Sequence, residues 1–164
     1  NTEVTDNQLK IELKSYAINP TKPIKYHLTV KDLNSVTISG TGKIESDSLN
    51  TTNLTIKIDG ASEGNIADLN VDQLIIDING AGKLNIAGTA TNQTIKILGA
   101  GNYSANNLTS KSASIDINGG GIATLRVSDI LDVIINGAGD ISYIGNPEIT
   151  KQISGAGNIQ QITG

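Results

Sequence analysis

The sequence contains no cysteine, methionine, tryptophan or phenylalanine, and its only aromatic residues are four tyrosines. Without cysteine, the chain can form no disulfide and has no thiolate for catalysis or metal binding. It has no run of about 18 apolar residues, which excludes a membrane-spanning helix. A single arginine, Arg126, and a net charge of −4 argue against a nucleic-acid partner.

Isoleucine and glycine are abundant, with 26 and 18 residues respectively in a chain of 164. This isoleucine content, together with only 17% charged residues, argues against intrinsic disorder. The length is that of a single domain. We therefore expect one folded domain with an aliphatic core.

A short glycine motif recurs seven times, and successive copies begin 18 to 20 residues apart. Its glycines are expected at chain corners, where positive φ or a close backbone approach favours this residue. These corner glycines are Gly40, Gly42, Gly60, Gly80, Gly82, Gly99, Gly101, Gly119, Gly121, Gly137, Gly139, Gly155 and Gly157. Four and two residues before each first glycine stand Val or Ile in six copies, and Lys151 and Ile153 in the seventh. Such alternation is typical of a half-buried strand.

Repeats of this length predict an all-β parallel β-helix, or β-solenoid, of about seven coils. One repeat cannot bury its own apolar face, whereas coils stacked about 4.8 Å apart place isoleucine on isoleucine. The crossover rule predicts right-handed coils. Two more inward columns are expected, four and nine residues after each first glycine. The second copy reads as stretched over Ser62–Ile66, and the later column runs through Leu49, Leu69, Thr89, Leu108, Ser128 and Asn146.

The outward positions show regular chemistry as well. Three residues before the first glycine, the charge alternates through Lys57, Asp77, Lys96 and Asp116 on four successive coils. Opposite charges on neighbouring strands favour this register, so we expect ion pairs between coils. One residue before the glycine, six of the seven copies carry Ser, Asp or Asn, which suits a polar ladder.

The N-terminal residues follow a different pattern. Apolar residues alternate over Leu9–Leu13 and again over Ile24–Val30, which predicts two strands joined by a loop from Ser15 to Pro23. We expect residues 1–35 to lead into the solenoid or to cap it, and residues 36–164 to form the solenoid repeats.

No constellation of catalytic residues emerges from these patterns. Asp77 and Asp116 lie two coils apart, about 9–10 Å, which is near the upper limit for an inverting glycosidase pair. Lys96 between them would keep both ionised, whereas one must act as an acid, so a role in register is the better interpretation. The single histidine, His27, has no partner residues for catalysis. Neither a phosphate-binding loop nor a calcium roll fits the glycine motifs, and no cofactor or metal site is predicted.

The segment from Gly137 to Ile159 repeats the Gly-Ala-Gly-Asp/Asn-Ile motif and includes Tyr143, Gly145 and Pro147 as a Tyr-x-Gly-x-Pro sequence. It resembles the head GIN domain family of putative bacterial autotransporter adhesins, and the resemblance extends from about Leu9 to Gly164. It implies an exported β-helical protein of the bacterial cell envelope or surface, with adhesion as the assumed role and no catalytic residues. Family members usually have more domain upstream of the segment that matches Asn1, so we expect the chain to be either a fragment or a form with a shortened cap.

Together these features favour a non-enzymatic adhesin that presents an extended polar face to a glycan or a surface protein. Asp77, Lys96, Asp116 and Tyr143 are the surface candidates for binding. A carbohydrate-active β-helix enzyme and a structural stalk or assembly module remain alternatives. The free strand edges of a solenoid also predict association of copies through the coil ends.

Overall fold

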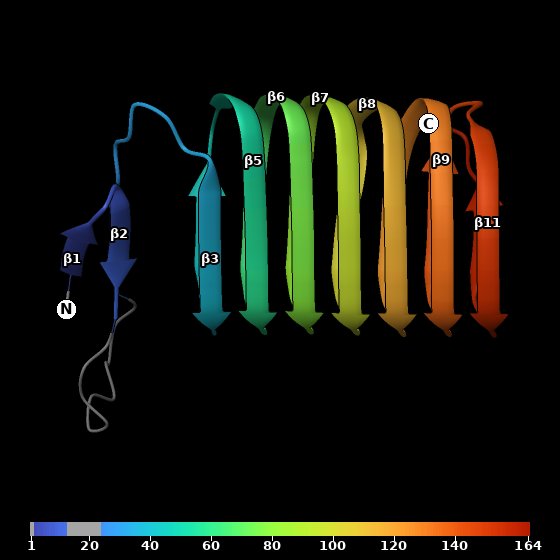
Figure 1. Cartoon of the computed structure of the whole chain (residues 1–164), viewed down its shortest axis with the longest axis horizontal. Helices are drawn as coiled ribbons and strands as arrows, with labels where there is room; N and C mark the ends of the chain where they lie inside the picture. The colour runs from blue at the N-terminus through green and yellow to red at the C-terminus, as the bar shows by residue number, and fades with distance from the viewer. Residues whose placement is uncertain (1, 13–23) are drawn as a thin grey trace. The chain divides into compact units, whose positions relative to one another are not determined.

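The computed structural model describes residues 2–12 and 24–164, and the chain divides into two compact units, residues 1–30 and 31–164. The larger unit is a parallel β-solenoid of about seven turns, which confirms the predicted fold class (Figure 1). Its strands are β3 (Ser35–Gly40), β4 (Lys43–Ser46), β5 (Leu49–Gly60), β6 (Glu63–Gly80), β7 (Lys83–Gly99), β8 (Asn102–Gly119), β9 (Ile122–Gly137), β10 (Asp140–Ile144), β11 (Glu148–Gly155) and β12 (Asn158–Gln161).

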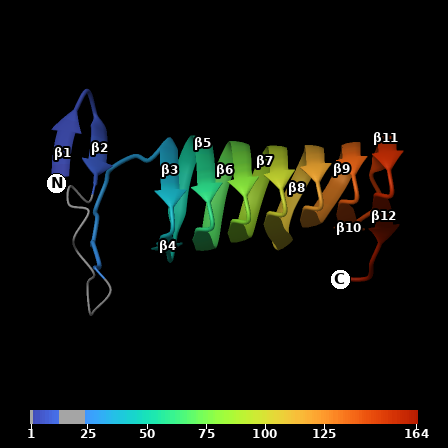
Figure 2. The same cartoon turned by 90° about the horizontal axis from the view of Figure 1, so that it is seen from below.

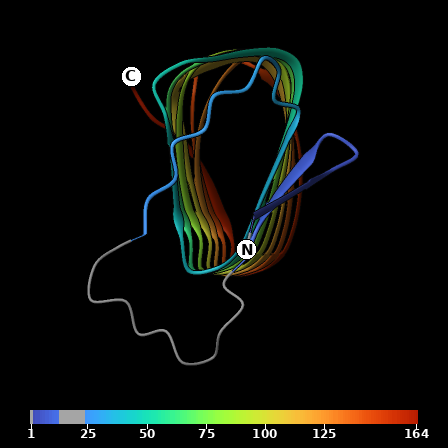
Figure 3. The ribbon, with the colours of Figure 1, turned by 90° about the vertical axis from the view of Figure 1, so that its left-hand side faces the viewer.

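Each coil pairs in parallel with the next one along the axis, β5 with β6, β6 with β7, β7 with β8 and β8 with β9. These strands lie side by side in the view from below, and the coils superimpose when seen along the axis (Figures 2 and 3). β6, β7 and β8 each follow almost a whole coil as one bent strand of 17 or 18 residues. Nearly every residue of a central coil therefore has a partner at the same position in its neighbours.

The core consists of stacked aliphatic columns in the interior of this solenoid. The two columns predicted before each glycine are buried in the five coils from β5 to β9, for example at Ile58, Ile78 and Ile97, which are 0% exposed. At the ends the same columns are open, with Val36 half-buried and Ile153 38% exposed. Isoleucine suits this position because its branched Cβ packs well on a pleated strand with a narrow interior.

Two details of the predicted columns are wrong. The second copy is not stretched, because Gly64 pairs in register with both Ile44 and Leu84. Leu84 occupies the space that a side chain at Gly64 would need, and its Cδ1 would lie 2.5 Å from an added Cβ. The apolar content of this column is therefore supplied by the neighbouring coil.

The later inward column also departs from the prediction. Leu69 and Leu108 are buried as expected, but the residue between them is Gly88 rather than Thr89. Thr89, Ser128 and Asn146 are exposed. The pairing register shifts after Ile66, between Asn85 and Ala87, and again between Ala105 and Thr109, so a constant count from the corner glycine does not follow the column.

The corners use glycine for two different reasons. Gly80 has a φ of +116°, and an added Cβ would lie 2.7 Å from the carbonyl oxygen of Gly60 on the coil below. Gly82 has no such φ, but its Cβ would lie 2.6 Å from Cγ2 of Ile58. The first glycine thus permits the turn, and the second allows the corner to close over the isoleucine column.

The smaller unit contains an antiparallel hairpin of β1 (Thr2–Thr5) and β2 (Gln8–Ile11). Its turn residues Asp6 and Asn7 have φ values of 51° and 62°, as a two-residue hairpin turn requires. β2 covers the start of the first predicted N-terminal strand, whereas Leu13 and the predicted loop from Ser15 to Pro23 lie outside the described residues. Residues 24–30 form no strand, so the second predicted strand is wrong. Alternation shows which side chains could share a face. A strand also needs a neighbouring strand for its backbone hydrogen bonds, and alternation does not indicate whether one is present.

Candidate functional site

The outward face of the first three coils carries short polar side chains at neighbouring positions. Asn50 pairs with Asn70, and Asn70 pairs with Thr89, so one residue from each of β5, β6 and β7 forms a column. Because side chains alternate along a strand, Val71, which follows Asn70 on β6, points into the core. The strand pairing therefore sets both the spacing and the direction of the polar groups.

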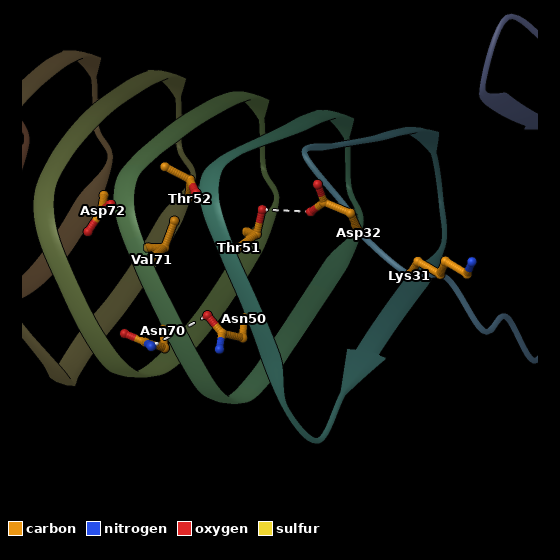
Figure 4. A pocket seen from close by; sticks show the side chains of 8 residues that line it. All are labelled: Lys31, Asp32, Asn50, Thr51, Thr52, Asn70, Val71 and Asp72. Atoms are coloured by element: carbon orange, nitrogen blue, oxygen red, sulfur yellow. Dashed lines mark hydrogen bonds between the residues drawn. The ribbon is translucent and has the colours of Figure 1, made fainter.

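These side chains line an open, polar hollow with a volume of about 470 Å³ (Figure 4). Its residues come from the segment before β3 and from β5 and β6: Lys31, Asp32, Asn50, Thr51, Thr52, Asn70, Val71 and Asp72. Two carboxylates, two amides, two hydroxyls and one ammonium thus surround it, and no aromatic side chain is among them. The hollow lies entirely within the larger unit.

Hydrogen bonds between coils hold most of these groups in place. The Thr51 hydroxyl donates to Oδ1 of Asp32 over 2.9 Å. Nδ2 of Asn70 donates to Oδ1 of Asn50 over 3.4 Å, and Oδ1 of Asn70 accepts from the Thr89 hydroxyl at 3.0 Å. At the edge of the hollow, the Thr91 hydroxyl donates to Oδ1 of Asp72 over 3.4 Å.

The charged column predicted from the sequence is formed, but its ion pairs are not those expected. Lys57, Asp77, Lys96 and Asp116 pair in register on successive coils. Nζ of Lys57 lies 3.9 Å from Oδ2 of Asp59, which is two residues further on the same strand. Oδ1 of Asp77 is enclosed and has no hydrogen-bond partner among the described residues. The register places Lys96 between Asp77 and Asp116, as the sequence indicated.

The column of small polar residues one position before each corner glycine does form ladders. Nδ2 of Asn79 donates to Oδ1 of Asp59 over 2.8 Å, and Nδ2 of Asn136 donates to Oδ1 of Asn118 over 3.0 Å. Leu98 occupies this position between the two pairs and is 39% exposed. Nδ2 of Asn118 turns to Oδ1 of Asp116 on its own strand at 2.8 Å, so this carboxylate belongs to the second ladder.

The two tyrosines in the solenoid have different environments. Tyr103 is 0% exposed, and its hydroxyl donates to Oε1 of Gln93 over 2.7 Å. Nε2 of Gln93 in turn donates to Oγ of Ser110 over 2.8 Å, and Ser110 donates to the carbonyl of Arg126. Burial raises the pKa of the Tyr103 hydroxyl well above its ordinary value. Tyr143, the predicted binding candidate, is half-buried and packs against the hydrophobic core.

Sequence reasoning did not identify the hollow as a site. The spacing of 20 residues between Asn50 and Asn70 does place them in one column, and this signal could have been used. Asp32 precedes the first repeat and has no periodic signal, so only the folded chain brings it to Thr51. Within residues 2–12 and 24–164, no three His, Asp or Glu side chains gather as metal ligands would. No described helix is long and apolar enough to cross a membrane.

Comparisons with known proteins place the chain in a family. The family model described as "Putative auto-transporter adhesin, head GIN domain" matches residues 1–147. A crystal structure of a putative adhesin from Bacteroides fragilis is similar with a TM-score of 0.91 and 30% identity, over 99% of this chain and 76% of that chain. No curated protein matches.

Two other solved structures share the fold. A putative adhesin from Parabacteroides distasonis has a TM-score of 0.77 and 23% identity, over 99% of this chain and 78% of that chain. One from Parabacteroides merdae has a TM-score of 0.68 and 22% identity, over 79% and 64% respectively. The stacked coils, the glycine corners and the family match agree, and the chain belongs to the head GIN domain family of putative auto-transporter adhesins.

Proposed function

We propose that this protein is a non-enzymatic adhesin of the bacterial cell envelope or surface, and that the outward face of its solenoid binds a glycan or a surface protein. The observation that carries the proposal is the polar hollow on β5 and β6, where coil-to-coil hydrogen bonds hold amide, hydroxyl and carboxylate groups in fixed positions. Groups that are held in place before binding lose less conformational entropy when a ligand arrives. The family match supports the adhesive role and the exported location.

The charges of the outward face favour binding over hydrolysis. An inverting glycosidase needs one carboxylic acid with a raised pKa and one carboxylate base. Asp77 and Asp116 lie two coils apart in the register, and the cationic Lys96 occupies the position between them. Association of copies through the coil ends stays a prediction, which light scattering over a range of protein concentrations would test.

The proposal is tested by adhesion of the folded chain. Beads coated with the protein are washed over printed glycans and over purified extracellular-matrix proteins, and retained beads are counted. We expect retention on at least one of these surfaces. Beads that carry the heat-unfolded chain serve as the control for non-specific adhesion. Equal retention of folded and unfolded chains on every surface would refute the adhesive role.

A further inference from the structure

We propose that the hollow on β5 and β6 is a carbohydrate site that binds one or two sugar units of a neutral glycan through their hydroxyl groups. The inference rests on the proposed adhesive function and specifies its ligand and its location. The free hydrogen-bonding groups of the hollow, its charge and the absence of an apolar anchor among its exposed lining residues support this assignment.

The two amide groups of the hollow have a fixed orientation. The Thr89 hydroxyl donates to Oδ1 of Asn70, whose Nδ2 donates to Oδ1 of Asn50. This chain of hydrogen bonds leaves Nδ2 of Asn50 as a donor with no partner among the described residues. Figure 4 shows the Asn50 and Asn70 side chains next to each other on adjacent coils. Adjacent coils lie about 4.8 Å apart, which is close to the length of one sugar unit along a glycan.

Asp32 and Asp72 add carboxylate oxygens to the lining of the hollow as acceptors. Oδ1 of Asp32 accepts from Thr51, which leaves Oδ2 of Asp32 for a ligand. Oδ1 of Asp72 accepts from Thr91, and Oδ2 of Asp72 is likewise left. A sugar hydroxyl both donates and accepts a hydrogen bond. Neighbouring hydroxyls on a sugar ring can therefore donate to a carboxylate and accept from the Asn50 amide, and hydrogen bonds to a charged acceptor are the stronger kind.

The charge of the hollow selects among glycans. Asp32 and Asp72 contribute two negative charges, and Lys31 at the edge contributes one positive charge. The whole chain has a net charge of −4. A glycan with carboxylate or sulfate groups would meet like charge, whereas a neutral glycan would not, and an amino sugar would be attracted.

The same residues argue against a protein as the ligand of this hollow. The residues that dominate protein–protein binding are mostly aromatic side chains and arginines in desolvated pockets. The hollow has neither among its lining residues, and its one apolar member, Val71, is only 4% exposed. An open polar site without an aromatic platform also implies weak binding of a single sugar unit, so adhesion would depend on many copies bound at once.

The test compares three classes of oligosaccharide and matched variants of the chain. Cellotetraose and mannotetraose are the neutral probes, a chitosan tetramer is the amino-sugar probe and tetragalacturonate is the acidic probe. Binding is measured by calorimetry and by retention of protein-coated beads on the immobilised sugars. We expect binding of at least one neutral probe and no binding of tetragalacturonate, and binding of the chitosan tetramer alone would contradict a site for neutral glycans.

Two variants locate the site. Asp32→Ala and Asn50→Ala should each lower the affinity for the probe by about fivefold to tenfold, because each removes one or two hydrogen bonds to the ligand. Asn136→Ala is the matched control, because Asn136 is an exposed asparagine in the ladder with Asn118 and lies outside the hollow. Its affinity should equal that of the wild type. Thermal unfolding monitored by circular dichroism shows that each variant is folded.

Each contrary result overturns the proposal. Binding that is unchanged in both Asp32→Ala and Asn50→Ala, or weakened equally in Asn136→Ala, would place the glycan elsewhere. Preference for tetragalacturonate would contradict the charge argument. If no oligosaccharide binds while the protein-coated beads still adhere to matrix proteins, the carbohydrate site is wrong and the adhesive function stands. If the beads adhere to nothing, both proposals fail.

Discussion

At the scale of single residues, the fold depends on positions where a side chain is not tolerated. Corner glycines stack from coil to coil, and an added Cβ at Gly60 or at Gly80 would lie within 2.7 Å of the carbonyl oxygen of the glycine on the coil below. Gly40 begins this column and has a positive φ, but nothing lies within 4 Å of its added Cβ. Gly120, the middle residue of another corner, has neither constraint. A comparison of substitutions at Gly80, Gly40 and Gly120 can therefore separate the cost of backbone strain from the cost of steric contact.

Alanine at these positions should therefore have graded effects. Gly80→Ala should lower the free energy of unfolding by roughly 2–4 kcal/mol, because φ strain and contact with Gly60 both oppose it. Gly40→Ala should lower it by about 1–2 kcal/mol from strain alone. Gly120→Ala should change it by no more than about 0.5 kcal/mol. Urea denaturation measures all three, and equal values for Gly80→Ala and Gly120→Ala would contradict the argument.

The buried Tyr103 network is the other feature that acts through individual groups. Three polar side chains, Tyr103, Gln93 and Ser110, lie within an aliphatic interior, and each has a hydrogen-bond partner. Such a network is tolerated because every member is satisfied, and removal of one partner leaves another unpaired. Burial favours the neutral form of the Tyr103 hydroxyl and raises its pKa.

Tyr103 should make stability depend on alkaline pH. The raised pKa means that its neutral form contributes full stability below the ordinary tyrosine pKa of about 10, and this contribution is lost as the pH rises above that value. Tyr103→Phe should cost about 1–3 kcal/mol at pH 7, because Oε1 of Gln93 loses its donor, and should make the decline between pH 10 and 11 less steep. Urea denaturation at several pH values measures both effects. Tyr143→Phe is the control, and an unchanged alkaline decline in Tyr103→Phe would refute this role.

At the scale of elements, each strand is specified by the alternation of apolar and polar residues along it and by the residues that it pairs with on the coils above and below. Ile97 and Ile78 form one inward column, whereas Ile75 on β6 faces outward between Thr55 and Thr94 and is 45% exposed. Both kinds of isoleucine have the same strand propensity. Their difference lies only in which face of the pleat they occupy.

This difference predicts opposite responses to a charge. Ile97→Asp would place a carboxylate inside the solenoid with no partner and should unfold the chain or cost several kcal/mol. Ile75→Asp should cost less than about 1 kcal/mol, because the new carboxylate points to water. Circular dichroism and thermal unfolding of the two variants measure the effect. A folded Ile97→Asp protein with wild-type stability would mean that the inward and outward faces are assigned wrongly.

At the scale of the whole molecule, the solenoid turns a repeated sequence into repeated surface chemistry. Neighbouring coils present Asn50 next to Asn70, and Asn118 next to Asn136, at a spacing that the backbone fixes. A rigid surface with regularly spaced polar groups is well suited to a ligand that is itself repetitive, as a glycan is. The candidate site nevertheless lies where the repeat begins, because Asp32 comes from the segment before the first strand.

Sequence periodicity alone predicts the solenoid, its corner glycines and its main isoleucine columns. Those features repeat every 18 to 20 residues, so each copy supplies the same evidence again. The later columns become apparent only in the folded structure, since the register shift after Ile66 brings Gly88, and not Thr89, into line with Leu69. The folded structure also decided that Lys57 pairs along its strand with Asp59 and that Asp32 meets Thr51. Periodicity fixes which residues stack, but local bulges and the directions of side chains depend on packing that no spacing records.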